Sequence, residues 1–277
     1  MRAVCERPED DTPRLRYAEF LEATGDPDDG LRAEFIRVQC ELARLVLPDE
    51  RWSQLEERKD ALEAYRERWA NELPKLDGVR WNPIDFPRGF VWDIWCDDAE
   101  AFRRNAAAIF VSAPIQSARF IRLRSLGPVL EVPELSRIRR LILERFALGP
   151  ADAQALAASL YVRNLAALHL SGNRIGDAGA KALAASPHLL RLDNLDLGHN
   201  RIGDKGAAAL AASPVVSTLS HLGLAGSLLT NAGAMALASS PHLGRLTGLT
   251  LWECKKIGAK GKEALKARFG DTVSFED

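Results

Sequence analysis

The sequence predicts an α/β solenoid, with a parallel β-sheet on its concave face and helices on its convex face, preceded by a small all-α domain. Three observations predict this fold. A leucine pattern recurs every 27 residues between positions 165 and 257. Each copy joins a short alternating stretch, typical of a strand, to a helix-forming stretch. Such short units cannot bury their apolar faces alone, so they are expected to stack.

The repeated motif is clearest at Leu165, Leu168, Leu170, Asn173 and Ile175. Three later copies follow it: Leu192, Leu195, Leu197, Asn200 and Ile202; Leu219, Leu222, Leu224, Ser227 and Leu229; Leu246, Leu249, Leu251, Cys254 and Ile257. The middle leucine advances by 27 residues each time. The sequence therefore predicts neighbouring parallel strands with their leucines in register.

Degenerate copies precede the clear ones. One step of 27 upstream stand Ile138, Leu141, Leu143 and Leu148, with Phe146 in the place of asparagine. Before them we expect strands at Ile121 and Leu123, and at Ile94 and Cys96. The spacing from Ile121 to Leu141 is only 20 residues, which predicts one short early repeat.

A short helix is predicted in each unit after the strand. Asp177, Asp204 and Asn231 stand at equivalent positions, where a side-chain oxygen is expected to cap the N–H groups of that helix. A Ser-Pro pair follows each helix, and proline is expected to end it.

Residues 1 to 82 carry no repeat. Helices are predicted over Pro13–Thr24, Leu31–Leu47 and Glu50–Leu73, with a turn at 25 to 30. The residues expected to form apolar faces are Leu15, Phe20 and Leu21 in the first helix and Phe35, Ile36, Val38, Leu42 and Leu45 in the second.

The repeats resemble leucine-rich repeats of the long subtype found in ribonuclease inhibitor and the Ran GTPase-activating protein. The resemblance implies that the strands line the concave face and that Asn173 and Asn200 form a buried ladder to loop backbone. Ser227 and Cys254 would occupy the same rung. We expect these side chains to satisfy backbone groups rather than to act in chemistry.

The segment from 8 to 45, PEDDTPRLRYAEFLEATGDPDDGLRAEFIRVQCELARL, resembles the helical repeat-companion domain that precedes leucine-rich repeats in some bacterial proteins. RGFVWDIW at 88 to 95 is similar to the entry strand of those chains, and the last fifteen residues are similar to their C-terminal cap. We therefore predict a companion domain and linker over 1–82 and the repeat solenoid over 83–277, in a protein of bacterial origin.

Charge and cysteine content narrow the class of protein. The formal net charge is −1, which argues against general binding to nucleic acid or membrane surfaces. Residues 1 to 80 hold 14 basic and 20 acidic side chains, a net of −6. No apolar run long enough for a membrane span is present, and the four cysteines lack metal-binding spacing. A cytoplasmic, monomeric protein without a cofactor is predicted.

The predicted concave face follows from strand register, because side chains between the inward leucines point outward. By strand it comprises Asp93 and Trp95; Phe120, Arg122 and Arg124; Arg140, Ile142 and Glu144; Ala167, His169 and Ser171; Asn194, Asp196 and Gly198; His221, Gly223 and Ala225; Gly248, Thr250 and Trp252. From this face we take seven partner-binding candidates: Arg122, Arg124, Arg140, His169, Asp196, His221 and Trp252.

The first candidates are basic. Residues 118 to 145 contain seven arginines against three glutamates, and Arg122, Arg124 and Arg140 are expected to lie side by side. A carboxylate-rich partner or a phosphate would relieve their repulsion. Neutralisation by the acidic helical domain explains the same cluster equally well.

His169, Asp196 and His221 form the second group, with His169 and Asp196 one strand spacing apart. Such a set suits metal binding or acid–base chemistry. No nucleophile motif accompanies it and the predicted face is open, so solvated side chains and no metal are expected. Trp252, beside small residues, is suited to a protein-binding hot spot or to packing under the C-terminal cap.

These features favour a non-enzymatic module that binds another protein on its concave face. A regulator of a small GTPase is the alternative from another class, implied by similarity to the Ran GTPase-activating protein, with Arg174 and Arg201 as loop candidates. A phosphorylated or nucleic-acid ligand on the arginine cluster is a third hypothesis, disfavoured by the near-neutral charge.

Overall fold

The computed structural model describes residues 1–46, 49–84 and 86–275. The chain forms two compact units. The first comprises Met1–Asp97 and Arg104–Ala118, and the second comprises Asp98–Arg103 and Arg119–Asp277. The domain boundary after residue 82 stays a prediction.

The first unit begins with five helices. They are α1 (Arg2–Glu6), α2 (Asp11–Thr24), α3 (Pro27–Leu42), α4 (Trp52–Glu63) and α5 (Arg66–Asn71). The predicted start of the second helix at Leu31 is wrong. Asp26 accepts hydrogen bonds from the backbone N–H groups of Asp28 and Asp29, so the helix begins four residues earlier. It ends at Leu42, and the predicted end, Leu47, lies outside the described residues.

The single helix predicted over Glu50–Leu73 is two helices, α4 and α5. The chain bends at Ala64 and Tyr65, between the two helices. The bend is accompanied by burial of Trp69, which is 1% exposed and packs against Phe35 with ring centroids 5.3 Å apart. Tertiary packing of one aromatic ring therefore accompanies the break, and the local sequence contains neither proline nor glycine to signal it.

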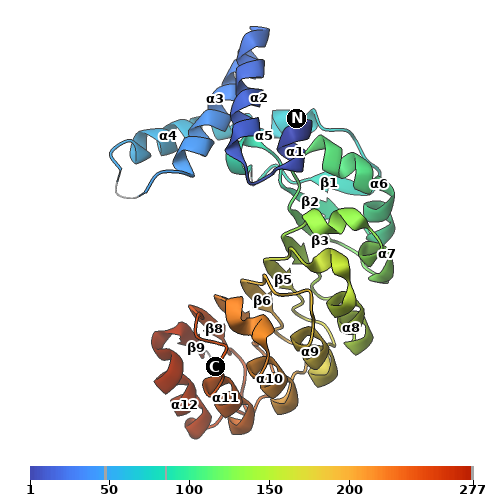
Figure 1. Ribbon diagram of the computed structural model, residues 1–277, viewed down its shortest axis with the longest axis vertical. Coiled ribbons are helices and arrows are strands. Elements are labelled where there is room, and N and C mark those ends of the chain that lie inside the picture. The colour runs from blue at the N-terminus through green and yellow to red at the C-terminus, as the bar shows by residue number, and fades with distance from the viewer. Residues whose placement is uncertain (47–48, 85, 276–277) are drawn as a thin grey trace. The chain divides into compact units, whose positions relative to one another are not determined.

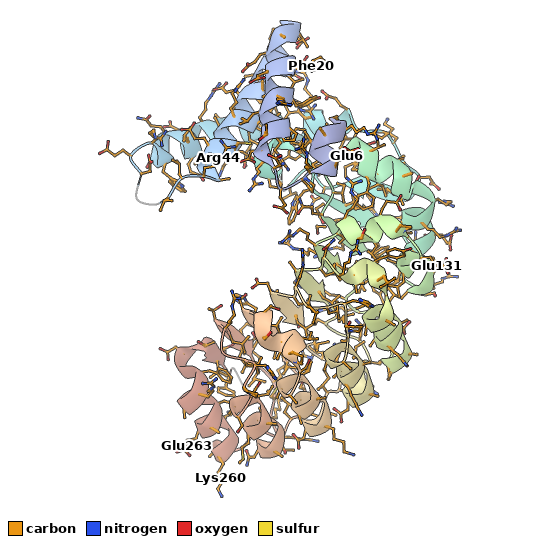
Figure 2. The ribbon with its side chains drawn as sticks, viewed as in Figure 1. Glu6, Phe20, Arg44, Glu131, Lys260 and Glu263 are labelled. Atoms are coloured by element: carbon orange, nitrogen blue, oxygen red, sulfur yellow. The ribbon has the colours of Figure 1, made fainter. Side chains whose placement is uncertain are left out.

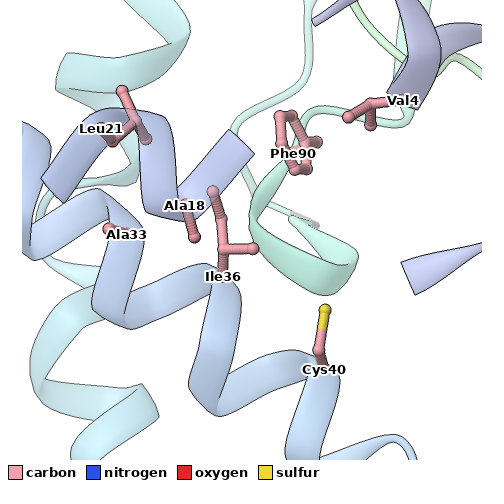
Figure 3. Packing of buried hydrophobic residues seen from close by; sticks show 7 residues of the cluster. All are labelled: Val4, Ala18, Leu21, Ala33, Ile36, Cys40 and Phe90. Atoms are coloured by element: carbon pink, nitrogen blue, oxygen red, sulfur yellow. The ribbon is translucent and has the colours of Figure 1, made fainter. Parts of the chain in front are cut away.

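The core of this unit lies between α2, α3 and the segment around Phe90 (Figure 3). Its buried members are Val4, Ala18, Leu21, Ala33, Ile36, Cys40 and Phe90. The predicted core position of Phe20 is wrong, because its side chain is 63% exposed at the surface of α2 (Figure 2). Leu21, one residue on, takes the buried position.

Two short strands follow the helices. β1 (Val79–Trp81) pairs antiparallel with β2 (Asp93–Cys96), and a short 3-10 turn, η1 (Pro87–Gly89), lies between them. The entry strand predicted within 88 to 95 therefore begins only at Asp93. α6 (Ala99–Ser112) and β3 (Ser117–Phe120) contribute residues to both units.

The second unit is the predicted solenoid of parallel strands and helices. Its strands are β4 (Arg140–Ile142), β5 (Ala167–His169), β6 (Asn194–Asp196), β7 (His221–Gly223), β8 (Gly248–Thr250) and β9 (Val273–Ser274). Each pairs in parallel with the next, and Leu168, Leu195 and Leu222 are direct register partners. The central prediction of stacked leucine pairs is thus confirmed.

Helices cover the other side of this sheet (Figure 1). They are α7 (Gly127–Leu130), α8 (Pro150–Ala158), α9 (Gly176–Ala184), α10 (Asp204–Ala211), α11 (Asn231–Ala238) and α12 (Ala259–Phe269). Short 3-10 turns complete the connections: η2 (Pro133–Arg137), η3 (Leu160–Val162), η4 (Pro214–Thr218) and η5 (Gly270–Thr272). Helices α9, α10 and α11 end before their Ser-Pro pairs, as predicted. Among the described residues, no helix has the length and apolar content needed to cross a bilayer.

The predicted strand at Ile121 and Leu123 is wrong. The buried alternating pair is Ala118 and Phe120, which are 0% and 4% exposed, whereas Ile121 is 39% exposed. The inward positions therefore advance from Ile94 to Ala118 by 24 residues and on to Leu141 by 23. A pattern built on branched aliphatic residues missed this copy, because alanine and phenylalanine fill its two inward positions.

A buried asparagine ladder joins the repeats, as predicted. The Asn173 amide donates to the carbonyls of Leu143 and Leu170 and accepts from the N–H groups of Phe146 and Leu148. Asn200 repeats the arrangement one unit on, donating to Leu170, Leu197 and Gly198. Each side chain thereby satisfies backbone groups of its own repeat and of the preceding one.

The same rung weakens toward the C-terminus. The Cys254 thiol donates to the Leu224 carbonyl at 3.2 Å. The buried Ser227 hydroxyl has no hydrogen-bond partner within the part of the chain that the structure describes. A serine side chain is too short to reach the carbonyls that asparagine reaches, so this rung contributes least.

The Asp and Asn side chains predicted to cap their own helices instead cap the next one. Asp177 Oδ1 accepts from the N–H groups of Gly203 and Gly206, at the start of α10. Asp204 accepts from the N–H groups of Thr230 and Gly233 at the start of α11. The amide oxygen of Asn231 accepts from the N–H groups of Gly258 and Gly261 at the start of α12. The sequence indicates which residue caps a helix, but it does not indicate whether that residue caps its own helix or the helix of the next repeat.

A series of buried serines, here called the serine ladder, links each repeat to the helix of the preceding repeat. The hydroxyls of Ser186, Ser213 and Ser240 donate to the carbonyls of Ala157, Ala184 and Ala211. All three serines are buried, and each hydroxyl bonds to the C-terminal end of the helix in the preceding repeat. Three sets of polar side chains therefore hold neighbouring repeats together besides the leucine core.

Replacing Asp204 with alanine is expected to lower the free energy of unfolding by about 1–2 kcal/mol, since a helix start loses its cap. Asp204→Asn should cost less, because Asn231 already caps α12 through an amide oxygen. Urea unfolding followed by circular dichroism measures both. Equal losses in the two variants would contradict the capping role.

Low pH should further distinguish aspartate from asparagine at position 204. Burial raises the pKa of Asp204, but the hydrogen bonds from Thr230 and Gly233 outweigh that effect and hold it below its ordinary value of 3.8. The carboxylate therefore contributes stability above pH 3.8 that is lost as the pH falls through the lower folded pKa. Asp204→Asn should remove this part of the acid dependence.

Candidate binding surface

The repeats are alike inside and different on the outward face of the sheet. Leucine occupies both inward strand positions in four successive units. The three outward positions hold Ala167, His169 and Ser171 in β5 and the turn after it; Asn194, Asp196 and Gly198 in the next unit; His221, Gly223 and Ala225; and Gly248, Thr250 and Trp252. At each outward position, all four residues differ. The chain therefore keeps its scaffold constant while varying one surface.

A second series of varied side chains lies in the turns that follow the strands. Positions 145, 172, 199, 226 and 253 are 27 residues apart and all have left-handed backbone geometry, with φ between 53° and 72°. Glycine occupies two of them, but Arg145, His199 and Glu253 occupy the others. Non-glycine residues pay about 1 kcal/mol or more in this region. Polar side chains are thus held at the edge of the sheet at a cost in stability.

The glycines in this series make room for their neighbours. A Cβ atom on Gly172 would lie 2.8 Å from Cγ of Arg145, and one on Gly226 would lie 2.2 Å from Nδ1 of His199. Each polar side chain therefore lies over the glycine of the following repeat.

The basic end of the surface differs from the one predicted. Arg122 and Arg124 are exposed, but they follow β3 instead of lying within a strand, so they do not stand in line with Arg140. The cause is the shifted register of β3. Arg119 takes the half-buried outward position in its place, and its Nη1 atom lies 3.8 Å from Oε2 of Glu144.

Two hollows accompany these arginines. One of about 440 Å³ is lined by Arg119, Phe120, Ile142, Glu144, Arg145 and Ser171, on the outward side of the strands. Ile142, predicted to be an outward residue, is only 7% exposed at its base. The other, of about 430 Å³, is lined by Asp98, Ala99, Glu100, Arg122, Arg124, Ser125 and Pro128. Four of the seven arginines thus line two separate hollows.

In the middle of the surface, His169 and Asp196 are register partners on neighbouring strands, as predicted. His221 does not join them. It pairs with Asn194, its ring lies close to Gly248, and its Nδ1 atom is 2.8 Å from the Ser220 hydroxyl.

Glu144 takes the place predicted for His221, with Oε1 lying 3.8 Å from Nδ1 of His169. Ligand atoms of Glu144, His169 and Asp196 lie within 4.8 Å of one another. The sequence placed Glu144 on this face but did not group it with His169, because the two are diagonal neighbours.

Burial lowers the pKa of His169 below its ordinary value of 6.5, although Asp196 and Glu144 oppose the shift. Arg140 and Arg119 add to the lowering. The imidazole is therefore neutral at neutral pH, and it separates two carboxylates without compensating their charge.

The C-terminal end of the surface carries an exposed aromatic ring. Trp252 is 44% exposed, so it is not covered by the C-terminal cap formed by α12 and β9. The small residues Gly223 and Ala225 occupy outward positions on the neighbouring unit, and both are half-buried. Asp93 was predicted at the opposite end of this face. Its side chain is only 7% exposed and accepts hydrogen bonds from the side chains of Asn82 and Trp95, so the predicted place on an open face is wrong.

The two loop arginines considered for GTPase regulation, Arg174 and Arg201, are both exposed. They occupy equivalent positions in successive repeats, and Arg201 has a positive φ of 57°. Arg174 donates its backbone N–H to the Leu148 carbonyl at 2.8 Å. Their shared position reflects the 27-residue repeat and not a separate site.

Comparisons with known proteins agree with this geometry. A family model described as "Leucine Rich repeat" matches residues 163–184 and 185–211. No match was found among curated proteins. Among solved structures, an internalin (InlF) from Listeria monocytogenes is similar at 17% identity, with a TM-score of 0.36. The match covers 59% of this chain and 54% of the internalin, so the chain spans about half of that protein. The second unit is an α/β solenoid of parallel strands and helices, and its residues 163–211 match the leucine-rich repeat model.

Proposed function

We propose that the chain is a non-enzymatic interaction module that binds another protein on the outward face of β4 to β8. The observation that carries the proposal is the contrast between constant inward positions and fully varied outward positions in four successive repeats. A surface that only needed to be soluble could repeat as the core does. An irregular surface suits a partner of irregular shape, as a folded protein is, better than a periodic polymer. Leucine-rich repeat proteins typically mediate protein–protein interactions.

The side chains on this face support a protein partner. Trp252 is an exposed aromatic ring beside small residues, which is the composition of an interface hot spot. Arg140 and His221 are exposed on β4 and β7. The left-handed turn residues Arg145 and His199 hold polar groups at the rim at a cost in stability, and such strain gathers at functional sites.

A cytoplasmic location and a monomeric state are part of the same proposal. All four cysteines are buried thiols in the structure, which suits a reducing compartment. The phosphate hypothesis loses its motivation, because Arg122 and Arg124 no longer line up with Arg140. GTPase regulation gains no support from the positions of Arg174 and Arg201.

The proposal predicts that surface variants on the two sides of the solenoid differ. A partner is first captured from native lysate with the full chain, identified and purified. Trp252→Ala and Arg140→Glu should each weaken its affinity at least about tenfold, or 1.4 kcal/mol, in calorimetric titration. Met235→Ala, a 53% exposed residue on α11, and Lys181→Glu on α9 are matched controls and should leave affinity unchanged.

A loss confined to the helix-side controls would refute the proposal. Thermal unfolding of each variant shows whether the fold is retained, and all four altered side chains are exposed. A captured partner that binds every variant with equal affinity would place its contact elsewhere on the chain.

A further inference from the structure

Three potential metal ligands from three successive repeats meet on the outward face of the sheet. His169 ends β5 and Asp196 ends β6, and the two are register partners. Glu144 lies two residues beyond the end of β4. One ligand atom from each lies within 4.8 Å of the other two. They are the one such group found in the described ranges 1–46, 49–84 and 86–275.

The two strand residues are held in place by the repeat geometry. The N–H of Gly198 donates to Oδ1 of Asp196 at 2.9 Å, which fixes the carboxylate and leaves Oδ2 available. A Cβ atom on Gly223 would lie 2.6 Å from the same oxygen, so the carboxylate needs a glycine on the neighbouring strand. Leu168 and Leu195, both buried, fix the register between His169 and Asp196. Pre-organised ligands lose little freedom on binding an ion.

Two carboxylates lie close together in this group, with two arginines near them. Glu144 and Asp196 repel each other across His169. Arg119 approaches Glu144 only to 3.8 Å, which is too long for a hydrogen bond. Arg140, on β4, faces the same group and also opposes a bound cation. The two arginines therefore limit the affinity, and Arg119 competes directly with an ion for Glu144.

We propose that Glu144, His169 and Asp196 bind one divalent transition-metal ion, with Zn²⁺ as the representative ion. An imidazole nitrogen with two carboxylates is a typical ligand set for zinc and its neighbours. Ca²⁺ and Mg²⁺ are disfavoured, because they prefer six or more oxygen ligands. Tetrahedral Zn²⁺ with bonds of about 2.0–2.1 Å brings its ligand atoms to about 3.4 Å from one another. Side-chain rotation can close the remaining distance without moving the strands.

Three protein ligands leave at least one coordination position open. The hollow of about 440 Å³ is lined by Glu144 and Ser171, so it adjoins the proposed site on the outward side. Its volume admits water or a side chain of a bound protein as a further ligand. The site is thus an accessible one, and a metal ion there would become part of the exposed surface.

Calorimetric titration of the full chain with Zn²⁺, after treatment with a chelator, tests the proposal. One ion should bind per chain. His169→Ala and Asp196→Asn should each weaken binding at least about tenfold, since each removes one of three ligands. His221→Ala is the matched control, because it lies on the same face outside the group, and it should not change the affinity. Arg119→Gln should strengthen binding by releasing Glu144.

Two further readouts keep the result independent of folding. Co²⁺ in place of Zn²⁺ should give visible absorption bands that are absent in His169→Ala, and circular dichroism melting should show that each variant remains folded. Absence of Zn²⁺ binding to the unaltered chain would overturn the proposal. Equal weakening by His221→Ala, or tighter binding of Mg²⁺ than of Zn²⁺, would also overturn it.

Discussion

Replacing Asn200 with alanine is expected to lower the free energy of unfolding by about 3 kcal/mol or more. The amide is 0% exposed and donates to the carbonyls of Leu170, Leu197 and Gly198. It also accepts from the N–H of Ile175. Alanine would leave these backbone groups buried without their partner, and each such group costs about 1–3 kcal/mol. Urea unfolding followed by circular dichroism measures the loss.

A matched control is Asn164→Ala. This asparagine also bonds across repeats, donating to the Ser136 carbonyl at 2.8 Å, but it is only half-buried. Water can replace its bond, so a loss of about 1 kcal/mol is expected. Ser227→Asn provides the converse test, since the amide can reach carbonyls that the buried serine hydroxyl does not, and stability should rise by about 1 kcal/mol. Equal losses for the first two variants would refute the ladder argument.

Gly89→Ala is expected to destabilise the first unit by about 3 kcal/mol or more. Gly89 has φ of 84°, and an added Cβ would lie 2.4 Å from Cγ1 of Ile36 and 3.0 Å from its Cα. A side-chain rotation of Ile36 could relieve the contact with Cγ1, but it would leave the tight contact with the α3 backbone at Cα. Ile36 and the neighbouring Phe90 belong to the core of this unit (Figure 3). Moving η1 away from α3 would also break the bond from the Gly89 N–H to Gln39 Oε1.

Gly25→Ala separates backbone strain from the clash. Gly25 has a similar φ of 73°, but an added Cβ would have nothing within 4 Å. Its substitution should therefore cost only about 1 kcal/mol, the price of the left-handed conformation. Hydrogen exchange of the α3 amides should speed up strongly in Gly89→Ala and slightly in Gly25→Ala. Similar exchange in both variants would show that the close approach to α3 is unimportant.

Prediction from the sequence succeeded where a residue type is specific to one structural environment, such as a buried inward position. The leucine pairs from Leu141 onward and the asparagine rungs were predicted correctly, because their burial is periodic. The strand at Ala118 and Phe120 was missed, since neither residue is specific to an inward position and the local spacing is shorter. The helix break at Ala64 also escaped, because distant packing of Trp69 accompanies it.

The candidate surface was predicted less completely. Adjacency of His169 and Asp196 followed from the 27-residue step alone. Glu144 was placed on the face but not beside His169, since diagonal contacts depend on side-chain direction. The positions of Arg122 and Arg124 depended on the register of β3, and the error there carried over to the predicted basic cluster.

The series of helix caps made by Asp177, Asp204 and Asn231 gives the repeat array a direction. Asp177 and Asp204 each cap the helix of the following repeat, so the starts of α10 and α11 depend on the unit before them. During synthesis on the ribosome, these two helices therefore emerge after the side chain that will cap them has already been made. Trimming whole units from the C-terminal side would leave the remaining starts capped, but removing the unit of Asp177 or Asp204 from the N-terminal side would expose the start of the next helix.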